Sequence, residues 1–115
     1  MTYVDGFLAA VPANKKAEYI QFAKTAGKVF KEHGALSVVD CWGDDVPEGK
    51  VTSMPMAVKR QADEIVVFGW VTWPSKDVRV KGMAKVMEDP RMQSTAMPFD
   101  GKRMIFGGFE IVSSL

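Results

Sequence analysis

Three acidic residues stand inside stretches that are otherwise apolar, and their carboxyls are the side chains best suited to acid–base chemistry. They are Asp5, Asp40 and Glu110. An ionised carboxylate is costly to bury unless it is paired, and an unpaired one takes the raised pKa that a general base uses. The favoured alternative is structural, with each acid at a strand end or paired with a basic side chain. The candidate partners are Arg79, Lys102 and Arg103.

Among the three acids, Asp40 is the first catalytic candidate and Glu110 is the second. Asp40 lies close to the aromatic Trp42 in a central part of its stretch. Trp42 and Trp70 fall in two runs that a hairpin would pair, so we expect them to share a face with a flat organic ligand. Packing in a core or an interface is the favoured alternative, because tryptophan dominates both.

Methionines form a second group of possible pocket residues. The chain has eight of them in 115 residues, and their flexible thioethers could line an adaptable apolar pocket. Filling gaps in the core is the more common use of each one. The candidate ligand-binding residues from these two patterns are Trp42, Trp70, Met97 and Met104.

The single histidine and the single cysteine offer less chemistry. His33 cannot form a site with other histidines, so we expect no metal. It falls in the last turn of a predicted helix, where a protonated imidazole suits the helix dipole. Cys41 follows Asp40, whose charge disfavours a thiolate, so a packed thiol is favoured over a nucleophile. Gly107-Gly108 lacks the spacing of a phosphate loop, and we expect no cofactor.

The spacing of apolar residues predicts the elements that carry these side chains. Strands are expected over residues 3–11, 35–42, 64–73 and 103–112, and helices over residues 15–33 and 76–88. Asn14 and Ser75 are the expected N-caps, and Gly34 should end the first helix. Residues 51–63 lack a clean period and should form an extended arm with one helical turn. Residues 91–98 should add a further turn of helix.

This order of elements, β-α-β-β-α-β, predicts an α+β fold. Two crossovers joined by a hairpin make a ferredoxin-like sandwich, with both helices on one face of an antiparallel sheet. At 115 residues the chain, residues 1–115, is expected to form a single domain.

Both faces of the predicted sheet are apolar, which is the argument for a homodimer. In the third strand Val66, Phe68 and Trp70 alternate with Ile65, Val67 and Val71. Two helices cover only one face, and the other would be a larger apolar patch than a monomer usually exposes. We therefore expect two antiparallel sheets to pack face to face about a two-fold axis, as a dimeric α/β barrel. The alternative is that residues 51–63 fold over the open face.

Composition argues against several classes of partner. A formal net charge of +1 gives no electrostatic reason to expect nucleic acid or an anionic membrane surface. No apolar run approaches the ~20 residues that span a bilayer. The N-terminus lacks the basic start of a signal peptide, and a lone cysteine forms no internal disulfide. The expected location is therefore the cytoplasm.

Three stretches of the chain carry a family resemblance. They are Asp5-Gly6-Phe7, the stretch from Asp40 to Pro47, and Trp73-Pro74-Ser75-Lys76 together with residues 97–109. They resemble the YbaA-like bacterial proteins, a family of unknown function, and the resemblance covers almost the whole chain. It implies the dimeric α/β-barrel superfamily, which includes cofactor-free monooxygenases, haem-degrading enzymes and isomerases. Such a fold does not choose among these activities.

The resemblance does not identify a catalytic residue, but it suggests roles for two other residues. It implies that the turn beginning at Phe99 closes the rim of a pocket, which makes Phe99 a further candidate ligand-binding residue. It also leaves open that His33 is a haem ligand, since some relatives in the superfamily use one histidine.

Two hypotheses follow for function. The first is a homodimer that holds a small aromatic or apolar organic molecule between sheet and helices, with Asp40 or Glu110 as a base if it is a cofactor-free monooxygenase or isomerase. The second is a non-catalytic dimeric module of a structural or stress-associated kind. A pocket that contains a desolvated acid would favour the first.

Overall fold

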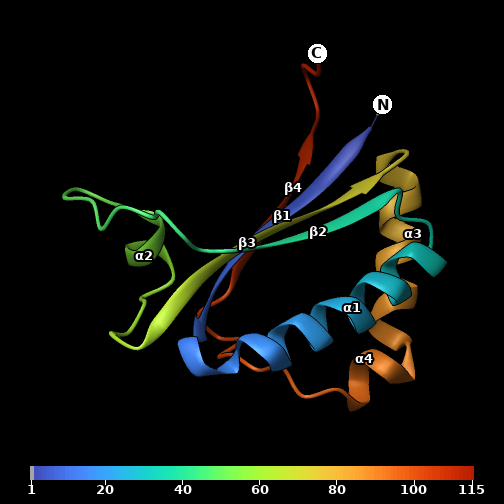
Figure 1. Cartoon of the computed structure of the whole chain (residues 1–115). Helices are drawn as coiled ribbons and strands as arrows, with labels where there is room; N and C mark the ends of the chain where they lie inside the picture. The colour runs from blue at the N-terminus through green and yellow to red at the C-terminus, as the bar shows by residue number, and fades with distance from the viewer. Residues whose placement is uncertain (1) are drawn as a thin grey trace.

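The computed structural model describes residues 2–115 and contains one four-stranded antiparallel sheet (Figure 1). Its strands run in the order β2-β3-β1-β4. Their bounds are β1 (Tyr3–Pro12), β2 (Ser37–Trp42), β3 (Glu64–Trp73) and β4 (Ile105–Glu110). The two long central strands pair along their whole length, so they form the rigid part of the sheet.

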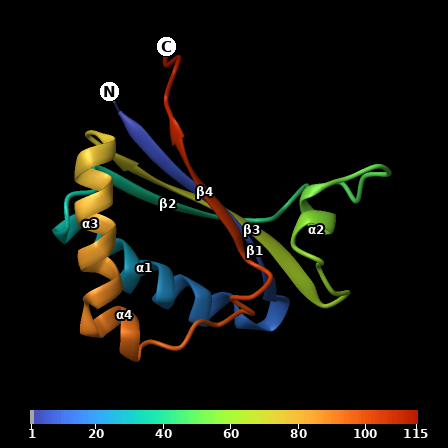
Figure 2. The same cartoon turned by 180° about the vertical axis from the view of Figure 1, so that it is seen from behind.

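Three helices lie on one side of this sheet, as Figures 1 and 2 show from opposite directions. They are α1 (Lys16–Glu32), which follows a short turn η1 (Ala13–Lys15), α3 (Lys76–Glu88) and α4 (Pro90–Ser94). A fourth, one-turn helix α2 (Met54–Ala57) belongs to the long connection between β2 and β3. The predicted α+β class is confirmed, and the arrangement is compatible with a ferredoxin-like fold.

The helix ends follow most of the sequence signals. Gly34 comes directly after the C-cap of α1 and has φ of +110°, a backbone conformation that glycine adopts at little cost. The Ser75 hydroxyl accepts a hydrogen bond from the Val78 amide and caps α3. The prediction for Asn14 is wrong. The chain makes the turn η1 first, so the N-cap falls on Lys15, which makes no side-chain cap.

Strand register divides the sheet into a helix-covered face and an open face. Asp5 pairs with Val71 and Ala9 with Val67, so the odd-numbered residues of β1 and β3 face the same way. This face holds two clusters of buried side chains. Their fully or nearly fully buried members are Ala9, Val11, Tyr19, Val67, Ala35, Val71 and Trp73.

The open face is apolar as predicted, and the arm covers only one end of it. Val58, which ends α2, packs against Ala10 and Val66. Beyond this cover Phe68 and Ile105 are each 42% exposed. Phe109 is 60% exposed on the edge strand β4. The arm therefore leaves a contiguous part of the apolar surface without a cover from this chain.

Candidate functional site

Asp40 meets a tyrosine of α1 on the helix-covered face. The pairs Val38–Val71, Asp40–Gly69 and Trp42–Val67 place the even-numbered side chains of β2 on this face. The Tyr19 hydroxyl, from the first turn of α1, donates a hydrogen bond of 2.9 Å to Asp40 Oδ1. Tyr19 itself is only 4% exposed, so its ring anchors the pair to the core.

The two groups of this pair shift each other's pKa. Loss of hydration around the Asp40 carboxyl raises its pKa, while the hydrogen bond from Tyr19 acts in the opposite direction. Burial and the neighbouring Asp40 carboxylate both raise the pKa of Tyr19. The phenol therefore keeps its proton at neutral pH and acts as a donor. The arrangement is a carboxyl that can exchange a proton, oriented by a neutral hydrogen-bond donor.

A groove opens beside this pair, between α1 and the edge strand β2. Its volume is about 450 Å³, in the range of small-molecule sites. The lining residues are Lys16, Tyr19, Ile20, Ala23, Lys24, Gly27, Val38, Asp40, Cys41 and Trp42. Most of this surface is apolar, and the Asp40 carboxyl stays accessible to solvent through the opening. The groove thus combines an apolar wall with a few convergent polar groups.

Aromatic and cationic side chains shape the end of the groove near the N-terminus of α1. The Tyr19 and Trp42 ring centroids lie 5.9 Å apart, with the rings tilted by 52°. Lys16 places its ammonium 5.5 Å from the centre of the Trp42 ring, which is within the range of a cation–π contact. A flat ligand that stacks on Trp42 would therefore also come close to the Asp40 carboxyl.

The other two acids take different positions. Asp5 is nearly buried, and Arg79 holds it with a two-pronged contact of 2.7 and 3.0 Å. The Trp73 indole donates a third hydrogen bond of 2.9 Å to it. Asp5 therefore has the structural role that the sequence offered as an alternative, with Arg79 among the named partners. Glu110 is exposed at the end of β4, away from the groove.

The predicted ligand-binding residues do not gather in one place. Trp42 lines the groove, but Trp70 lies on the open face, where it contacts Phe68. The expectation that the two tryptophans share a face is wrong, because the β2–β3 register pairs Trp42 with Val67 rather than with an even-numbered residue.

Phe99 and Met104 pack behind Tyr19 rather than in the groove. Both contact the buried cluster that contains Tyr19. The Phe99 ring lies 6.2 Å from that of Tyr19 and 5.8 Å from that of Phe22. Met97 is half exposed, and its methyl group lies against Gly101. Phe99 and Met104 therefore belong to the packing around Tyr19, whereas Met97 lies at the turn that contains Gly101.

His33 and Cys41 have ordinary surroundings. His33 is the C-cap of α1, and its Nε2 lies 3.3 Å from Asp89 Oδ2 at the junction of α3 and α4. Cys41 is half-buried in β2 as a free thiol. Within residues 2–115 there is no cluster of His, Cys, Asp and Glu side chains that could hold a metal ion. In the same range no helix is both long enough and apolar enough to cross a membrane.

Tyr19 and Lys16 are the site residues that sequence analysis missed. Tyr19 belongs to the same helical stripe as Phe22, Ala26 and Val29, at spacings of three and four residues. That spacing was the available signal, and it would have placed a buried hydroxyl on the sheet-facing side of α1. Lys16 carried no signal, because its contact with Trp42 depends on how α1 crosses β2.

The chain is thus an α+β protein with a groove on the helix-covered side of a single antiparallel sheet. Residues 2–101 match the model of a family described as a protein of unknown function (DUF1428). The chain belongs to this family. The uncharacterized YbaA proteins of Escherichia coli K12 and of Shigella flexneri are each 56% identical to it over 114 residues, covering 97% of both chains. The predicted resemblance is confirmed.

Proposed function

We propose that this protein binds a small aromatic or apolar organic molecule in the groove between α1 and β2. The observation that carries the proposal is the Tyr19–Asp40 hydrogen bond, which fixes a carboxyl of raised pKa beside the Trp42 ring. The carboxyl is partly desolvated by the apolar wall and yet accessible from solvent, so it can reach a ligand in the groove. The same carboxyl is the group to which a proton-transfer step, as in an isomerase, would be assigned.

The composition of the groove supports an organic ligand over an inorganic one. Ile20, Ala23 and Val38 supply apolar surface, while Trp42 offers a flat face for stacking. Asp40 and Tyr19 add a hydrogen-bonding pair that gives a ligand one orientation. Ligand sites of small proteins commonly have this composition, with a few polar groups on a mainly apolar surface.

The test is a screen of small aromatic and quinone-like compounds by thermal shift, followed by NMR mapping of each hit. We expect hits to move the resonances of Gly27 and of the Trp42 indole. The variant Tyr19→Phe removes the donor and should weaken hits that bond to Asp40 by roughly fivefold, as expected for about one net hydrogen bond.

Tyr3→Phe is the matched control for this experiment. It removes a hydroxyl from the same face of the sheet at the opposite end, where Tyr3 contacts Arg79. Its ligand affinity should equal that of the unmodified protein. A screen without hits, or hits that move only resonances of the open face such as Trp70, would contradict the proposal.

A specific observation also favours a homodimer, and we propose that its interface is the open face of the sheet. Phe68, Ile105 and Phe109 are exposed there in the single chain. Packing two such faces together gives the two-sheet arrangement expected from the sequence, and it leaves the groove between α1 and β2 accessible. The proposed dimer interface is thus independent of whether the groove binds a ligand.

A further inference from the structure

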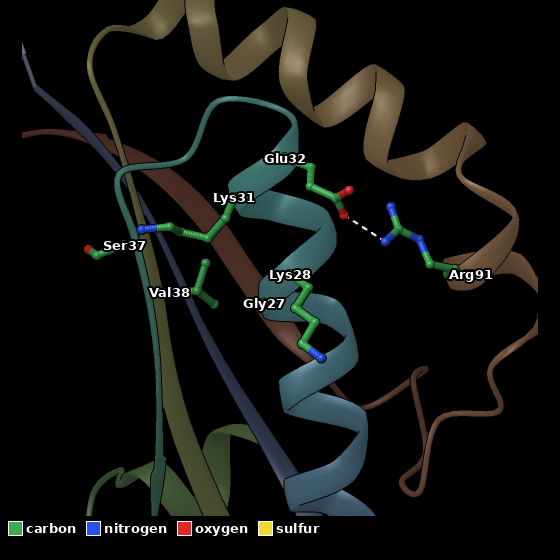
Figure 3. A pocket seen from close by; sticks show the side chains of 7 residues that line it. All are labelled: Gly27, Lys28, Lys31, Glu32, Ser37, Val38 and Arg91. Carbon is green, nitrogen blue, oxygen red and sulfur yellow. Dashed lines mark hydrogen bonds and ion pairs between the residues drawn. The ribbon is translucent and has the colours of Figure 1, made fainter.

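A second hollow continues the groove along α1 toward its C-terminal end. Figure 3 shows it between α1 and β2, with Val38 of β2 facing the helix and Lys31 reaching across toward the strand that carries Ser37. Its volume is about 730 Å³. The lining residues are Gly27, Lys28, Lys31, Glu32, Ser37, Val38 and Arg91. Gly27 and Val38 line both hollows, so the two form one elongated groove.

Gly27 keeps the floor of this groove open. It lies in the middle of a 17-residue helix, where glycine is less favourable than alanine. A Cβ at this position would lie 3.9 Å from Val38, which is ordinary contact, so packing does not require a glycine here. A larger side chain would fill the groove at the point where the two hollows join.

The second hollow is basic. Among residues 2–115 neither Lys28 nor Lys31 forms an ion pair with a carboxylate, and Lys31 donates only to the Leu36 carbonyl, at 3.0 Å. Arg91 is different, because Glu32 contacts it at 2.6 Å (Figure 3) and Asp89 contacts it at 2.8 Å, which offsets its charge. Three cations and two carboxylates leave this end of the groove with a net charge of +1, which Lys28 and Lys31 supply.

Lys16 and Lys24 line the opposite end of the groove, so cations lie at both ends, but this end also holds an acidic side chain. Asp40 lies there, and its partner Tyr19 is neutral. An anionic group would be repelled by the Asp40 carboxylate and attracted by Lys28 and Lys31. The Lys28–Lys31 end is therefore the better place for an anionic group, because its lining carboxylate, Glu32, is paired with Arg91.

We infer that the ligand of this groove is an organic acid with an elongated apolar or aromatic body. Its anionic group lies at Lys28 and Lys31, its body passes over Gly27 and Val38, and its far end stacks on Trp42 beside Asp40. Lys28 lies nine positions after Tyr19 in α1, which corresponds to about 14 Å along the helix axis. This inference rests on the proposed function and adds the chemical class and orientation of the ligand.

The test compares two probes of equal shape, phenylhexanoate and its neutral amide phenylhexanamide, by NMR titration at low salt. We expect both to move the Trp42 indole resonance, and the acid to bind about tenfold more tightly, because two nearby cations act on its charge. The double variant Lys28→Gln with Lys31→Gln should remove this preference, so that the acid binds no more tightly than the amide.

Lys81→Gln with Lys85→Gln is the matched control, since it removes the same charge from exposed positions of α3. It should keep the preference for the acid. A second variant, Gly27→Leu, fills the floor and should abolish binding of both probes while the helix stays folded.

The possible outcomes separate the two proposals. Equal affinity for acid and amide in the groove would overturn the inference about charge and leave the proposed function standing. A preference that survives the Lys28 and Lys31 substitutions would also overturn it. If neither probe moves the Trp42 resonance, or if Gly27→Leu binds both unchanged, the groove is not a ligand site and both proposals fail.

Discussion

At the scale of single residues, Asp5 and Asp40 show why one acid is structural and the other is a candidate for chemistry. Both follow apolar residues in a strand and face the helices. Asp5 receives a full opposite charge from Arg79, which offsets the cost of its burial. Asp40 receives only a neutral hydroxyl from Tyr19. Its charged form is stabilised less, so its pKa is the one that rises.

The pKa of Asp40 should rise further in Tyr19→Phe. The hydrogen bond from Tyr19 lowers this pKa, so its removal leaves the effect of desolvation unopposed. An NMR titration of the Asp40 side-chain carboxyl should show a value above the ordinary 3.8 in the unmodified protein and a higher one in the variant. Tyr3→Phe should not change it. An unchanged or lowered pKa in Tyr19→Phe would show that the hydroxyl does not stabilise the carboxylate.

The same shift fixes how Asp40 contributes to stability. Its folded-state pKa lies above the unfolded value, so between the two values the folded protein binds more protons. The contribution of Asp40 to the free energy of unfolding therefore falls as pH rises through this window. Above the window the ionised carboxylate is unfavourable for folding. Asp40→Asn, which still accepts the hydrogen bond from Tyr19, should accordingly be tolerated at neutral pH.

At the scale of elements, the sequence specified the long strands and helices better than the contacts between them. β3 was predicted with the bounds that the structure has, because seven apolar residues lie between Glu64 and the stop at Pro74. The Ser75 cap made the start of α3 equally clear. Met87 lies four residues after the half-buried Met83, at a helical spacing, and is nevertheless 66% exposed. The side of α3 that packs against Trp73 carries Gly82, and the spacing of apolar residues in α3 does not predict this contact.

Replacing either of two helical glycines by alanine should change the free energy of unfolding, but in opposite directions. Gly27→Ala should raise the free energy of unfolding by about 0.5–1 kcal/mol, since alanine favours helix and the new methyl makes only ordinary contact. Gly82→Ala should lower it by roughly 1–3 kcal/mol, because the methyl overlaps the His33 carbonyl and the Trp73 ring.

Urea denaturation of both variants measures this difference. If both substitutions raised the free energy of unfolding equally, α3 would have to move away from Trp73 at no cost. The contact of Gly82 with α1 and β3 would then not hold the helices in position. Opposite signs would show that the groove beside Gly27 has free space where the contact at Gly82 has none.

At the scale of the whole molecule, the sequence predicted two apolar sheet faces. It did not predict which part of the open face the arm would cover. The apolar residues at both odd and even positions of β1 and β3 were sufficient to predict that both faces are apolar. The position of the arm depends on Val58 meeting Val66 and also Ala10, which is far from Val58 in the sequence. The same limit explains the error over Trp42 and Trp70. Their faces depend on the register between β2 and β3, which a long connection does not fix.

The part of the open face that the arm leaves uncovered gives the prediction that concerns the whole molecule. Phe68 lies on a central strand of this face, beside Trp70. A two-fold dimer with a standard interface of ~1,600 Å² would bury it, and a lysine there would place a charge in the contact. We expect Phe68→Lys to sediment as a monomer and the unmodified protein as a dimer.

Met87→Lys is the control for this substitution, because it introduces the same charge at another exposed apolar position, on α3 and outside the open face. It should remain dimeric, and circular dichroism should show that both variants keep the helices and the sheet. A monomeric unmodified protein at micromolar concentration, or a dimeric Phe68→Lys, would contradict the interface. In that case Phe68, Ile105 and Phe109 would be exposed to solvent in the native protein, and ligand binding in the groove would have to be explained by the single chain alone.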